Sequence, residues 1–504
     1  MLMKRAAFFE LALPSCDSDQ SPSRWLYESL RAAILEGRIR PGIRLPATRD
    51  LARQYRLARG TIVNAFEQLK SEGYIQSSVG SGTYVNKILP EELLQVAPMG
   101  SPVLPARHQP RRELSDYARR VQLFPNFEIR PSRAFRTNMP ALDLFPTTLW
   151  AQVAARRLRR VSASLLLGCG PMGYPPLRDA VASYLSTSRG VKCVADQVVI
   201  VSGVQEAIDI AVRLFVNPED RVCMENPGYP GAAIAFKAAG AKISAIFVDD
   251  EGMQVPGANV RSARLVYVTP GHQFPLGVTM SVARRLQLLD WAAKSGALIL
   301  EDDYDSEYRY AGRPVPALQG LDRHGLVLFT GSFSKVLFPS LRVGYVVVPP
   351  DLVDYVAASV SVTNRHAPLL EQVILCDFIT EGHLGRHLRR MREVYARRLS
   401  ILLECAQPSL CGLLEISGVE AGLQIAGWLH RGLNAESVAT AAATRGVEVT
   451  ALSRYRQGAA VPEGLQLGFA AVDSKEIRRG VRELTITLEN ELKTLPGNRS
   501  SACV

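Results

Sequence analysis

Apolar residues recur every three or four positions in the first part of the chain, which is the spacing of helices that bury one face. This pattern predicts helices over Trp25–Ile39, over Arg49–Tyr55 with Thr48 as its N-cap, and over Arg59–Glu72. Residues 75–85 then form two short strand-like runs around a glycine-rich tip, which predicts a hairpin. The order helix, helix, turn, helix, hairpin indicates one small folding unit.

That order of elements is the plan of a winged helix-turn-helix domain, which docks on duplex DNA. The charges agree, since only Asp50 opposes seven arginines in one short window. The seven are Arg38, Arg40, Arg44, Arg49, Arg53, Arg56 and Arg59. A cationic cluster beside a helix N-terminus suits contacts to phosphate, although the arginines alone are equally compatible with a solvated basic face. The element pattern and the charges together predict double-stranded DNA as a partner.

The pattern changes after residues 89–134, which are rich in Pro, Arg and Gln and which we expect to form a semi-extended linker. Beyond them, short β-branched strands alternate with amphipathic helices. Four of the strands are predicted at 197–201, 264–268, 297–300 and 326–329. Such alternation is typical of an α/β domain with a mostly parallel sheet. We therefore expect a small domain at residues 20–88 and a large α/β domain at residues 135–492.

The composition fits an ordinary globular protein, with 47% hydrophobic and 21% charged residues among 504. No apolar run approaches the roughly 18 residues that a membrane helix needs, and the N-terminus is a poor export signal. Eight cysteines are scattered without a CxxC pair, which favours reduced thiols over disulfides or a metal site. We therefore expect a cytoplasmic protein that binds neither membrane nor metal. The net charge of +11 is by itself weak support for DNA binding.

A Gly-Ser-Phe-Ser-Lys motif at residues 331–335 follows the last predicted strand. The amine of Lys335 could form a Schiff base with an aldehyde cofactor. Ser332 and Ser334 offer hydroxyls to a phosphate, and Arg342, seven residues beyond the lysine, offers a planar cationic fork to the same group. The motif and the spaced arginine together indicate a site for a phosphorylated aldehyde.

Acidic residues end the preceding predicted strand, in the segment Leu300–Asp305. The carboxyl ends of parallel strands are where ligands bind in such sheets. A carboxylate there, such as that of Asp302, could keep a pyridine nitrogen protonated and make the ring an electron sink. Tyr304 could form a hydrogen bond with the phenolic oxygen of that ring. A charged loop without a ligand is the alternative for these residues alone.

Two more motifs fit the same chemistry. Ser202, Gly203, Val204 and Gln205 lie between a predicted strand and a helix, where backbone amides bind phosphate well. Alone, this is also a common strand-to-helix turn. Tyr229, in an Asn-Pro-Gly-Tyr segment, could stack on a cofactor ring or could be an ordinary packed aromatic in a turn.

In this order and at this spacing the four motifs resemble those of fold type I pyridoxal-phosphate enzymes, the aspartate-aminotransferase-like group, over about residues 142–492. The resemblance implies pyridoxal 5'-phosphate (PLP) as cofactor, held as an internal aldimine on Lys335, with Asp302 at the ring nitrogen and Tyr304 at the ring oxygen. It also implies that Tyr229 stacks on the ring. The residues that it places around the phosphate are Ser202, Gly203, Val204, Gln205, Ser332, Ser334 and Arg342. A smaller C-terminal α/β subdomain and a homodimer are further implications.

The N-terminal unit resembles the GntR-type DNA-binding domain. The segments that carry this resemblance are 42–52, 58–63, 72–74 and 80–83. It implies that Arg49, Arg59 and Thr61 approach the DNA, with Gly80 in the wing. One departure is Ala58, at a position where a capping Ser or Thr is common; the missing cap should cost about 1 kcal/mol. With both parts joined, the whole chain resembles the MocR-like regulators.

Two positions depart from the aminotransferase pattern. Phe274 replaces the asparagine that aminotransferases usually carry before the proline of a Pro-x-Gly turn, as is usual in MocR-like chains. Gln466 stands where aminotransferases carry an arginine that binds the substrate carboxylate, and an amide cannot supply that bidentate ionic contact. This weakens the case for efficient turnover of ordinary α-amino acids.

The leading hypothesis is therefore a regulator that binds promoter DNA and senses an amine or amino-acid effector, or PLP itself. One alternative is a working aminotransferase that carries a DNA-binding domain, and another is a DNA-binding scaffold with an empty pocket. Neither the effector, nor the operator, nor the sign of regulation can be inferred from the sequence.

Overall fold

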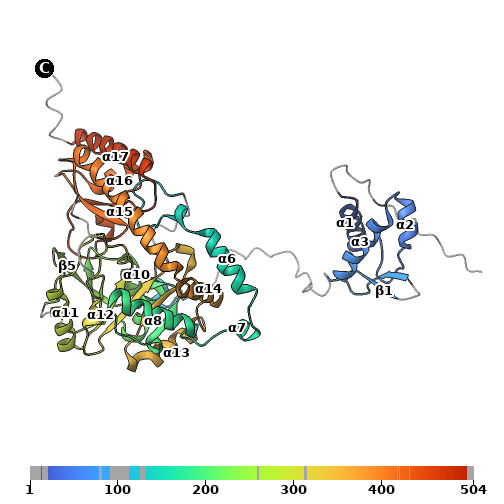
Figure 1. Ribbon diagram of the computed structural model, residues 1–504, viewed down its shortest axis with the longest axis horizontal. Coiled ribbons are helices and arrows are strands. Elements are labelled where there is room, and N and C mark those ends of the chain that lie inside the picture. Colours follow the sequence, from blue (N-terminus) through green and yellow to red (C-terminus); the bar gives the residue numbers. More distant parts are fainter. Residues whose placement is uncertain are drawn as a thin grey trace, which may run out of the picture. The chain divides into compact units, whose positions relative to one another are not determined.

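The computed structural model describes residues 13, 21–78, 82–90, 113–124, 131–257, 260, 262–310, 315–416, 418, 421–430 and 432–495. The chain divides into two compact units, residues 1–112 and 113–504 (Figure 1). Within the described part of the chain, no helix is both long enough and apolar enough to cross a membrane.

The N-terminal unit contains three helices and an antiparallel hairpin. They are α1 (Pro22–Leu35), α2 (Thr48–Gln54), α3 (Arg59–Ser71), β1 (Ile75–Ser78) and β2 (Gly82–Val85). Leu30 of α1 shares a buried apolar cluster with Ile62 and Phe66 of α3, and the register of the hairpin pairs Ile75 with Val85. The predicted winged helix-turn-helix plan is confirmed.

Two details of these helices differ from the prediction. α1 ends at Leu35 rather than at Ile39, because Gly37 adopts the left-handed conformation (φ +71°) that stops a helix. Thr48 is the first helical residue of α2 and not its cap, and the residue before it makes no capping bond. Ala58 is the N-cap of α3 and, as expected, supplies no side-chain hydrogen bond.

The large unit is built on an eight-stranded sheet in the order β3-β10-β9-β8-β7-β4-β5-β6. Its strands are β3 (Val198–Val201), β4 (Arg221–Asn226), β5 (Lys242–Asp249), β6 (Gly252–Met253), β7 (Ala263–Val268), β8 (Leu298–Asp303), β9 (Val327–Ser332) and β10 (Gly344–Val347). Strands β9, β8, β7, β4 and β5 are parallel, whereas β10 is antiparallel to both of its neighbours and β6 to β5. The prediction of a mostly parallel sheet is confirmed.

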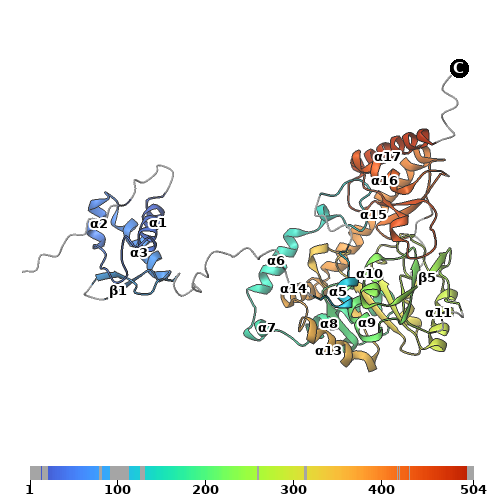
Figure 2. The same cartoon turned by 180° about the vertical axis from the view of Figure 1, so that it is seen from behind.

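Helices cover both faces of this sheet, because successive residues of each strand point to opposite sides. Val199 and Val201 of β3 share a buried cluster with α9 and α10, whereas Val198 and Ile200 share another with α8 and α14 (Figures 1 and 2). The helices of this part are α6 (Thr147–Leu158), α7 (Ala163–Leu167), α8 (Pro175–Arg189), α9 (Val204–Phe215), α10 (Pro230–Ala239), α11 (Val282–Ser295), α12 (Leu318–Leu321), α13 (Val353–Thr363) and α14 (Leu369–Thr380).

The C-terminal part of the large unit forms a smaller α/β subdomain. Its elements are α15 (His383–Leu410), β11 (Leu414–Ile416), β12 (Gln424–Leu429), α16 (Ala435–Thr444), β13 (Thr450–Ala451), β14 (Gly464–Gly468) and α17 (Ser474–Thr494). The four strands form an antiparallel sheet in the order β11-β12-β14-β13. Both views show α15, α16 and α17 side by side at the C-terminal end of the chain (Figures 1 and 2).

Part of the stretch predicted to be a linker is structured on the large unit. Helix α5 (Asp116–Arg120) begins after Ser115, whose side chain accepts a hydrogen bond from the amide of Ala118. The Arg120 side chain donates a hydrogen bond to the backbone carbonyl of Ala238 in α10. No periodic signal marks this helix, because five residues are fewer than the window in which helical periodicity can be recognised.

Candidate cofactor site and DNA-binding surface

The cofactor residues predicted from separate motifs meet at one edge of the large sheet. Lys335 lies three residues after β9, Asp302 is the last residue but one of β8, and Tyr229 lies three residues after β4. Gly203 follows β3, and Arg342 precedes the antiparallel β10. Since parallel strands end at the same edge and an antiparallel strand begins there, residues far apart in the sequence converge.

The Lys335 amine lies among polar groups at this edge. Its Nζ donates a hydrogen bond of 2.5 Å to the backbone carbonyl of Asn138. Burial lowers the pKa of Lys335 to about 8, and the carboxylates of Asp305 and Asp302 limit the decrease. Near neutral pH such an amine is unprotonated far more often than an exposed lysine, and only the unprotonated form attacks an aldehyde.

Asp302 is buried, with 4% of its surface exposed. Its Oδ2 accepts a hydrogen bond of 2.6 Å from the Tyr267 hydroxyl, whereas its Oδ1 has no partner among the described residues. Burial raises the pKa of Asp302 to about 7, and the bond from Tyr267 acts in the opposite direction. A buried carboxylate oxygen without a donor is costly. The protonated nitrogen of a pyridine ring is a donor of the kind that this oxygen lacks, so the residues present fit PLP.

Several of the proposed phosphate residues lie at the beginning of α9. Gly203 has φ +127°, and a Cβ at this position would lie 3.3 Å from Nη1 of Arg342. The Arg342 guanidinium therefore lies against the end of a helix that already favours anions. Val204 is the first residue of α9. Ser332 Oγ accepts a hydrogen bond from the amide of Ser334.

Some polar groups of this region already form hydrogen bonds within the protein, and others have no partner among the described residues. The Ser334 hydroxyl and Gln205 Oε1 are buried without partners among the described residues, while the Gln205 amide nitrogen donates to the carbonyl of Gly231. The backbone amide of Ser202 donates to the carboxylate of Glu206. The Ser334 hydroxyl is thus able to donate to a phosphate, whereas the Ser202 amide would first have to leave Glu206.

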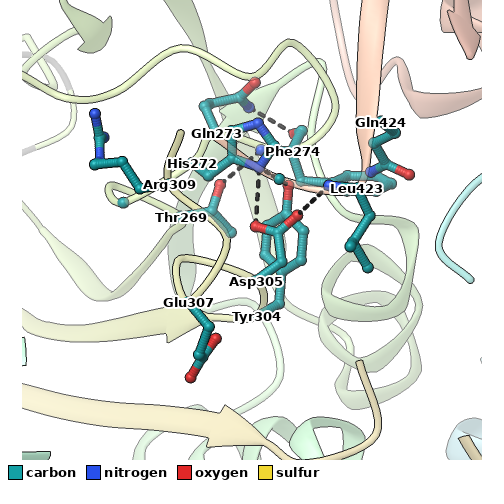
Figure 3. A network of polar contacts seen from close by, with 12 residues as sticks. Thr269, His272, Gln273, Phe274, Tyr304, Asp305, Glu307, Arg309, Leu423 and Gln424 are labelled. Carbon is teal, nitrogen blue, oxygen red and sulfur yellow. Dashed lines mark hydrogen bonds and ion pairs between the residues drawn. The ribbon is translucent and has the colours of Figure 1, made fainter. Parts of the chain in front are cut away.

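Aromatic side chains form the wall where a cofactor ring would lie. The ring of Tyr229 stacks on that of Tyr267, with centroids 6.3 Å apart, and meets the edge of Phe274 at 5.7 Å. The Tyr304 hydroxyl lies 3.1 Å from Nδ1 of His272 (Figure 3). Phe274, which replaces the usual asparagine, also packs against Tyr304 and Tyr455. At this position Phe274 makes aromatic packing contacts, whereas the usual asparagine would offer a hydrogen bond from its side-chain amide.

Gln466 lies fully buried in β14 and is committed to protein partners. Its Oε1 accepts a hydrogen bond of 2.8 Å from the Tyr455 hydroxyl, and its Nε2 lies 3.4 Å from the carbonyl of Pro275. A cavity of about 720 Å³ lies nearby and is lined by Tyr229, Phe274 and Tyr455 among others. Gln466 brings no positive charge to this region.

Sequence reasoning missed three contributors to the site. Asn138 holds the Lys335 amine, Tyr267 holds Asp302, and Phe124 packs on Tyr229 with ring centroids 6.1 Å apart. Asn138 and Phe124 lie about two hundred and one hundred residues before their partners, and no local pattern marks them. The position of Tyr267 on β7, beside β8, was the one usable signal, because neighbouring parallel strands bring same-face side chains together.

Three of the four predicted DNA-contacting residues lie on the second and third helices of the N-terminal unit. Arg49 is an exposed residue of α2, and Arg59 and Thr61 lie in the first turn of α3, where Arg59 is exposed. Within the described residues no ion pair holds Arg49 or Arg59, whereas Arg53 has Asp50 at 4.0 Å. Gly80 lies outside the described residues.

Comparisons with known proteins agree with both parts. Residues 138–484 match the family described as aminotransferase class I and II, and residues 22–85 match the bacterial regulatory proteins of the gntR family. The chain is 39% identical over 490 residues to the probable rhizopine catabolism regulatory protein MocR of Rhizobium meliloti, which spans 96% of this chain and 98% of that protein. It is 29% identical to the pyridoxine biosynthesis transcriptional regulator PdxR of Corynebacterium glutamicum, with 91% of this chain and 94% of that one covered.

Among solved structures, the chain is similar to the alpha-aminoadipate aminotransferase LysN of Thermus thermophilus, in complex with N-(5'-phosphopyridoxyl)-L-leucine. The TM-score is 0.69 at 27% identity, with 76% of this chain and 98% of that chain covered. The chain belongs to the MocR-like family of transcription regulators, in which a GntR-type winged helix-turn-helix domain is joined to a domain of the aminotransferase class I and II fold.

Proposed function

We propose that this chain is a PLP-dependent regulator that binds promoter DNA through its winged helix-turn-helix domain and carries PLP as an internal aldimine on Lys335. The signal is an amine or amino-acid effector, or PLP itself. The observation that carries the proposal is the buried Oδ1 of Asp302, which has no partner in the described part of the chain and lies near a lysine of lowered pKa. The same chain also has a GntR-type domain.

Each site residue has a proposed role toward PLP, whose aldehyde carbon reacts with amines when it is bound. Lys335 supplies the amine, Asp302 holds a proton at the ring nitrogen, Tyr304 donates to the ring oxygen and Tyr229 covers the ring face. The phosphate contacts are proposed for Ser202, Gly203, Val204, Gln205, Ser332, Ser334 and Arg342.

On the DNA side we propose contacts from Arg49, Arg59, Thr61 and Gly80. The exposed cationic side chains of α2 and α3 support phosphate contacts from the two arginines. The proposed bounds are residues 20–88 for the DNA-binding domain, 89–134 for the linker and 135–492 for the PLP domain. A cytoplasmic homodimer would place two such domains on paired half-sites.

An effector amine that displaces Lys335 changes DNA binding only if the two states of the protein bind it with different affinity. The names of two relatives refer to rhizopine catabolism and to pyridoxine biosynthesis. They support control by a small molecule or by the B6 vitamin pathway itself.

The test is binding of the full chain to the region upstream of its own gene, at moderate salt, with and without PLP and a panel of amines. Visible absorbance of bound PLP is recorded in parallel for the native chain and for Lys335→Ala. We expect DNA binding, an absorbance that Lys335→Ala abolishes, and a PLP- or amine-dependent change in DNA affinity. A chain that stays colourless with saturating PLP, or that binds no such DNA under any condition, would contradict the proposal.

A second candidate is an active aminotransferase, favoured by the similarity to LysN in its phosphopyridoxyl-leucine complex. Steady release of keto acid from an amino donor would support it. A spectral change that appears once on adding an amine and then persists would favour the sensor.

A further inference from the structure

Three segments of the large unit meet around the hydroxyl of Tyr304 (Figure 3). His272 comes from the loop after β7, Tyr304 and Asp305 come from the loop after β8, and Leu423 immediately precedes β12 of the C-terminal subdomain. His272 is 3% exposed and Asp305 is 1% exposed. The contacts among them are therefore shielded from water, where hydrogen bonds are strong and unmade ones are costly.

One nitrogen of His272 has two neighbours. Its Nδ1 lies 2.9 Å from Oδ1 of Asp305 and 3.1 Å from the Tyr304 hydroxyl oxygen. An ionised carboxylate only accepts hydrogen bonds, so the contact with Asp305 requires a hydrogen on Nδ1. A nitrogen that carries this hydrogen has no lone pair left to accept the hydroxyl hydrogen of Tyr304.

The other nitrogen of the ring supports the same tautomer. His272 Nε2 is buried and has no partner among the described residues. A buried N–H without an acceptor is rarer in native proteins than a buried lone pair without a donor. With the hydrogen on Nδ1, the unpartnered Nε2 is only a lone pair, which is the less costly arrangement.

The position of the pair is fixed from the C-terminal subdomain. Oδ2 of Asp305 accepts a hydrogen bond of 3.3 Å from the backbone amide of Leu423. The backbone at Gly422 passes so close to the imidazole that a Cβ there would lie 2.0 Å from Cε1 of His272. The observed position of the imidazole beside Asp305 therefore requires a glycine at position 422.

We propose that His272 and Asp305 are positioning residues for Tyr304: Asp305 keeps the hydrogen on Nδ1 of His272, which leaves the Tyr304 hydroxyl hydrogen free to be donated to the ring oxygen of PLP. This inference rests on the proposed function, since it concerns the same PLP site. The carboxylates of Asp302 and Glu225 and the side chain of Gln424 also affect the pKa of Tyr304, so those residues are left unchanged in the test.

The test is a double-mutant cycle between Asp305→Asn and Tyr304→Phe in the full chain, read from the absorbance spectrum of bound PLP, its pH midpoint and the dissociation constant of PLP. Glu307→Gln is the matched control. It removes a buried carboxylate two residues away in the same loop, but one that pairs with Arg189 and Tyr184 and not with His272. His272→Gln is the second variant, and it replaces Asp305→Asn if the latter does not fold.

We expect Asp305→Asn to move the pH midpoint and to weaken PLP binding about tenfold, as for the loss of one hydrogen bond in a buried site. In the Tyr304→Phe background the same change should move neither quantity further, because the hydroxyl through which it acts is gone. Glu307→Gln should leave the spectrum unchanged.

An equal effect of Asp305→Asn in both backgrounds would overturn the inference, because it would show that the carboxylate acts directly on the Lys335 amine, whose pKa it also raises. No effect in either background would overturn it as well. A native chain without PLP absorbance would instead refute the proposed function, so the two failures are distinguishable.

Discussion

At the scale of single residues, burial favours the uncharged forms of both Lys335 and Asp302. It lowers the pKa of the Lys335 amine to about 8 and raises that of the Asp302 carboxyl to about 7. Both shifts disfavour the charged form, as expected where solvent is displaced. A bound cofactor with a positive ring nitrogen would reverse the balance for Asp302, since an adjacent positive charge favours the carboxylate.

The lowered pKa of Lys335 predicts how fast the apoprotein takes up PLP. Only the unprotonated amine reacts, so the attachment rate should rise roughly tenfold per pH unit below pH 8 and level off above it. Stopped-flow absorbance between pH 6 and 10 measures this, with Lys335→Ala as the blank. A rate that still climbs steeply at pH 10 would show that the amine behaves as an ordinary exposed lysine.

Gln466 predicts which ligands the site prefers. Gln466→Arg should tighten binding of an α-amino acid about tenfold or more, because a charge-assisted bidentate bond to a carboxylate replaces an uncharged amide. It should not change binding of the corresponding amine without the carboxyl group. Spectral titration with both ligands is the measurement, and Gln466→Met controls for loss of the amide alone. Equal gains for both ligands would contradict this role.

At the scale of elements, the site is made where strands end and the chain turns. Gly203 lets β3 pass into α9 with a positive φ while the Arg342 guanidinium lies against it. Gly344, at the start of β10, permits an equally close approach, since a Cβ there would lie 2.9 Å from the Cα of Gly203. The proposed phosphate site therefore depends on two glycines, Gly203 after β3 and Gly344 at the start of β10, where a side chain would push the two segments apart.

Gly203→Ala should weaken PLP binding about tenfold, since an L side chain at φ +127° is strained and its Cβ would press on Arg342. Gly296→Ala is the control, because Gly296 also has a positive φ but no atom of a described residue lies within 4 Å of its Cβ position. Fluorescence titration of both variants gives the comparison. If the control loses as much affinity as Gly203→Ala, general destabilisation is the cause.

The elements were largely predictable because their periodicity is local. The strands ending near Lys335 and Asp302 are short apolar runs, and the helices of the N-terminal unit repeat every three to four residues. The contact between Asn138 and Lys335 was not predictable, because the carbonyl that accepts the hydrogen bond belongs to the backbone and leaves no mark in the pattern of side chains. Helix α5 was not predictable because it is too short to show a helical period. Local motifs suggested the chemistry of Lys335, Asp302 and Arg342, and the resemblance to a family added that these motifs act together on one cofactor.

At the scale of the whole molecule, a DNA-binding unit and a proposed PLP-binding unit share one chain, so DNA binding and cofactor binding can be tested separately. Arg59→Ala should weaken binding to all DNA sequences alike and reduce the slope of log affinity against log salt by about 1. Arg24→Ala, which removes an exposed arginine paired with Glu28 in α1, is the control. Binding isotherms at several salt concentrations measure both, and a sequence-dependent loss would instead point to base contact by Arg59.

The bare backbone at Gly422 has a consequence for anyone who recombines such proteins. Its φ of +92° and the imidazole against it leave no room for any side chain at the seam where the C-terminal subdomain meets the sheet. A chimaera that imports this subdomain from a relative should assemble properly only if the graft brings a glycine to that position, whatever else it changes.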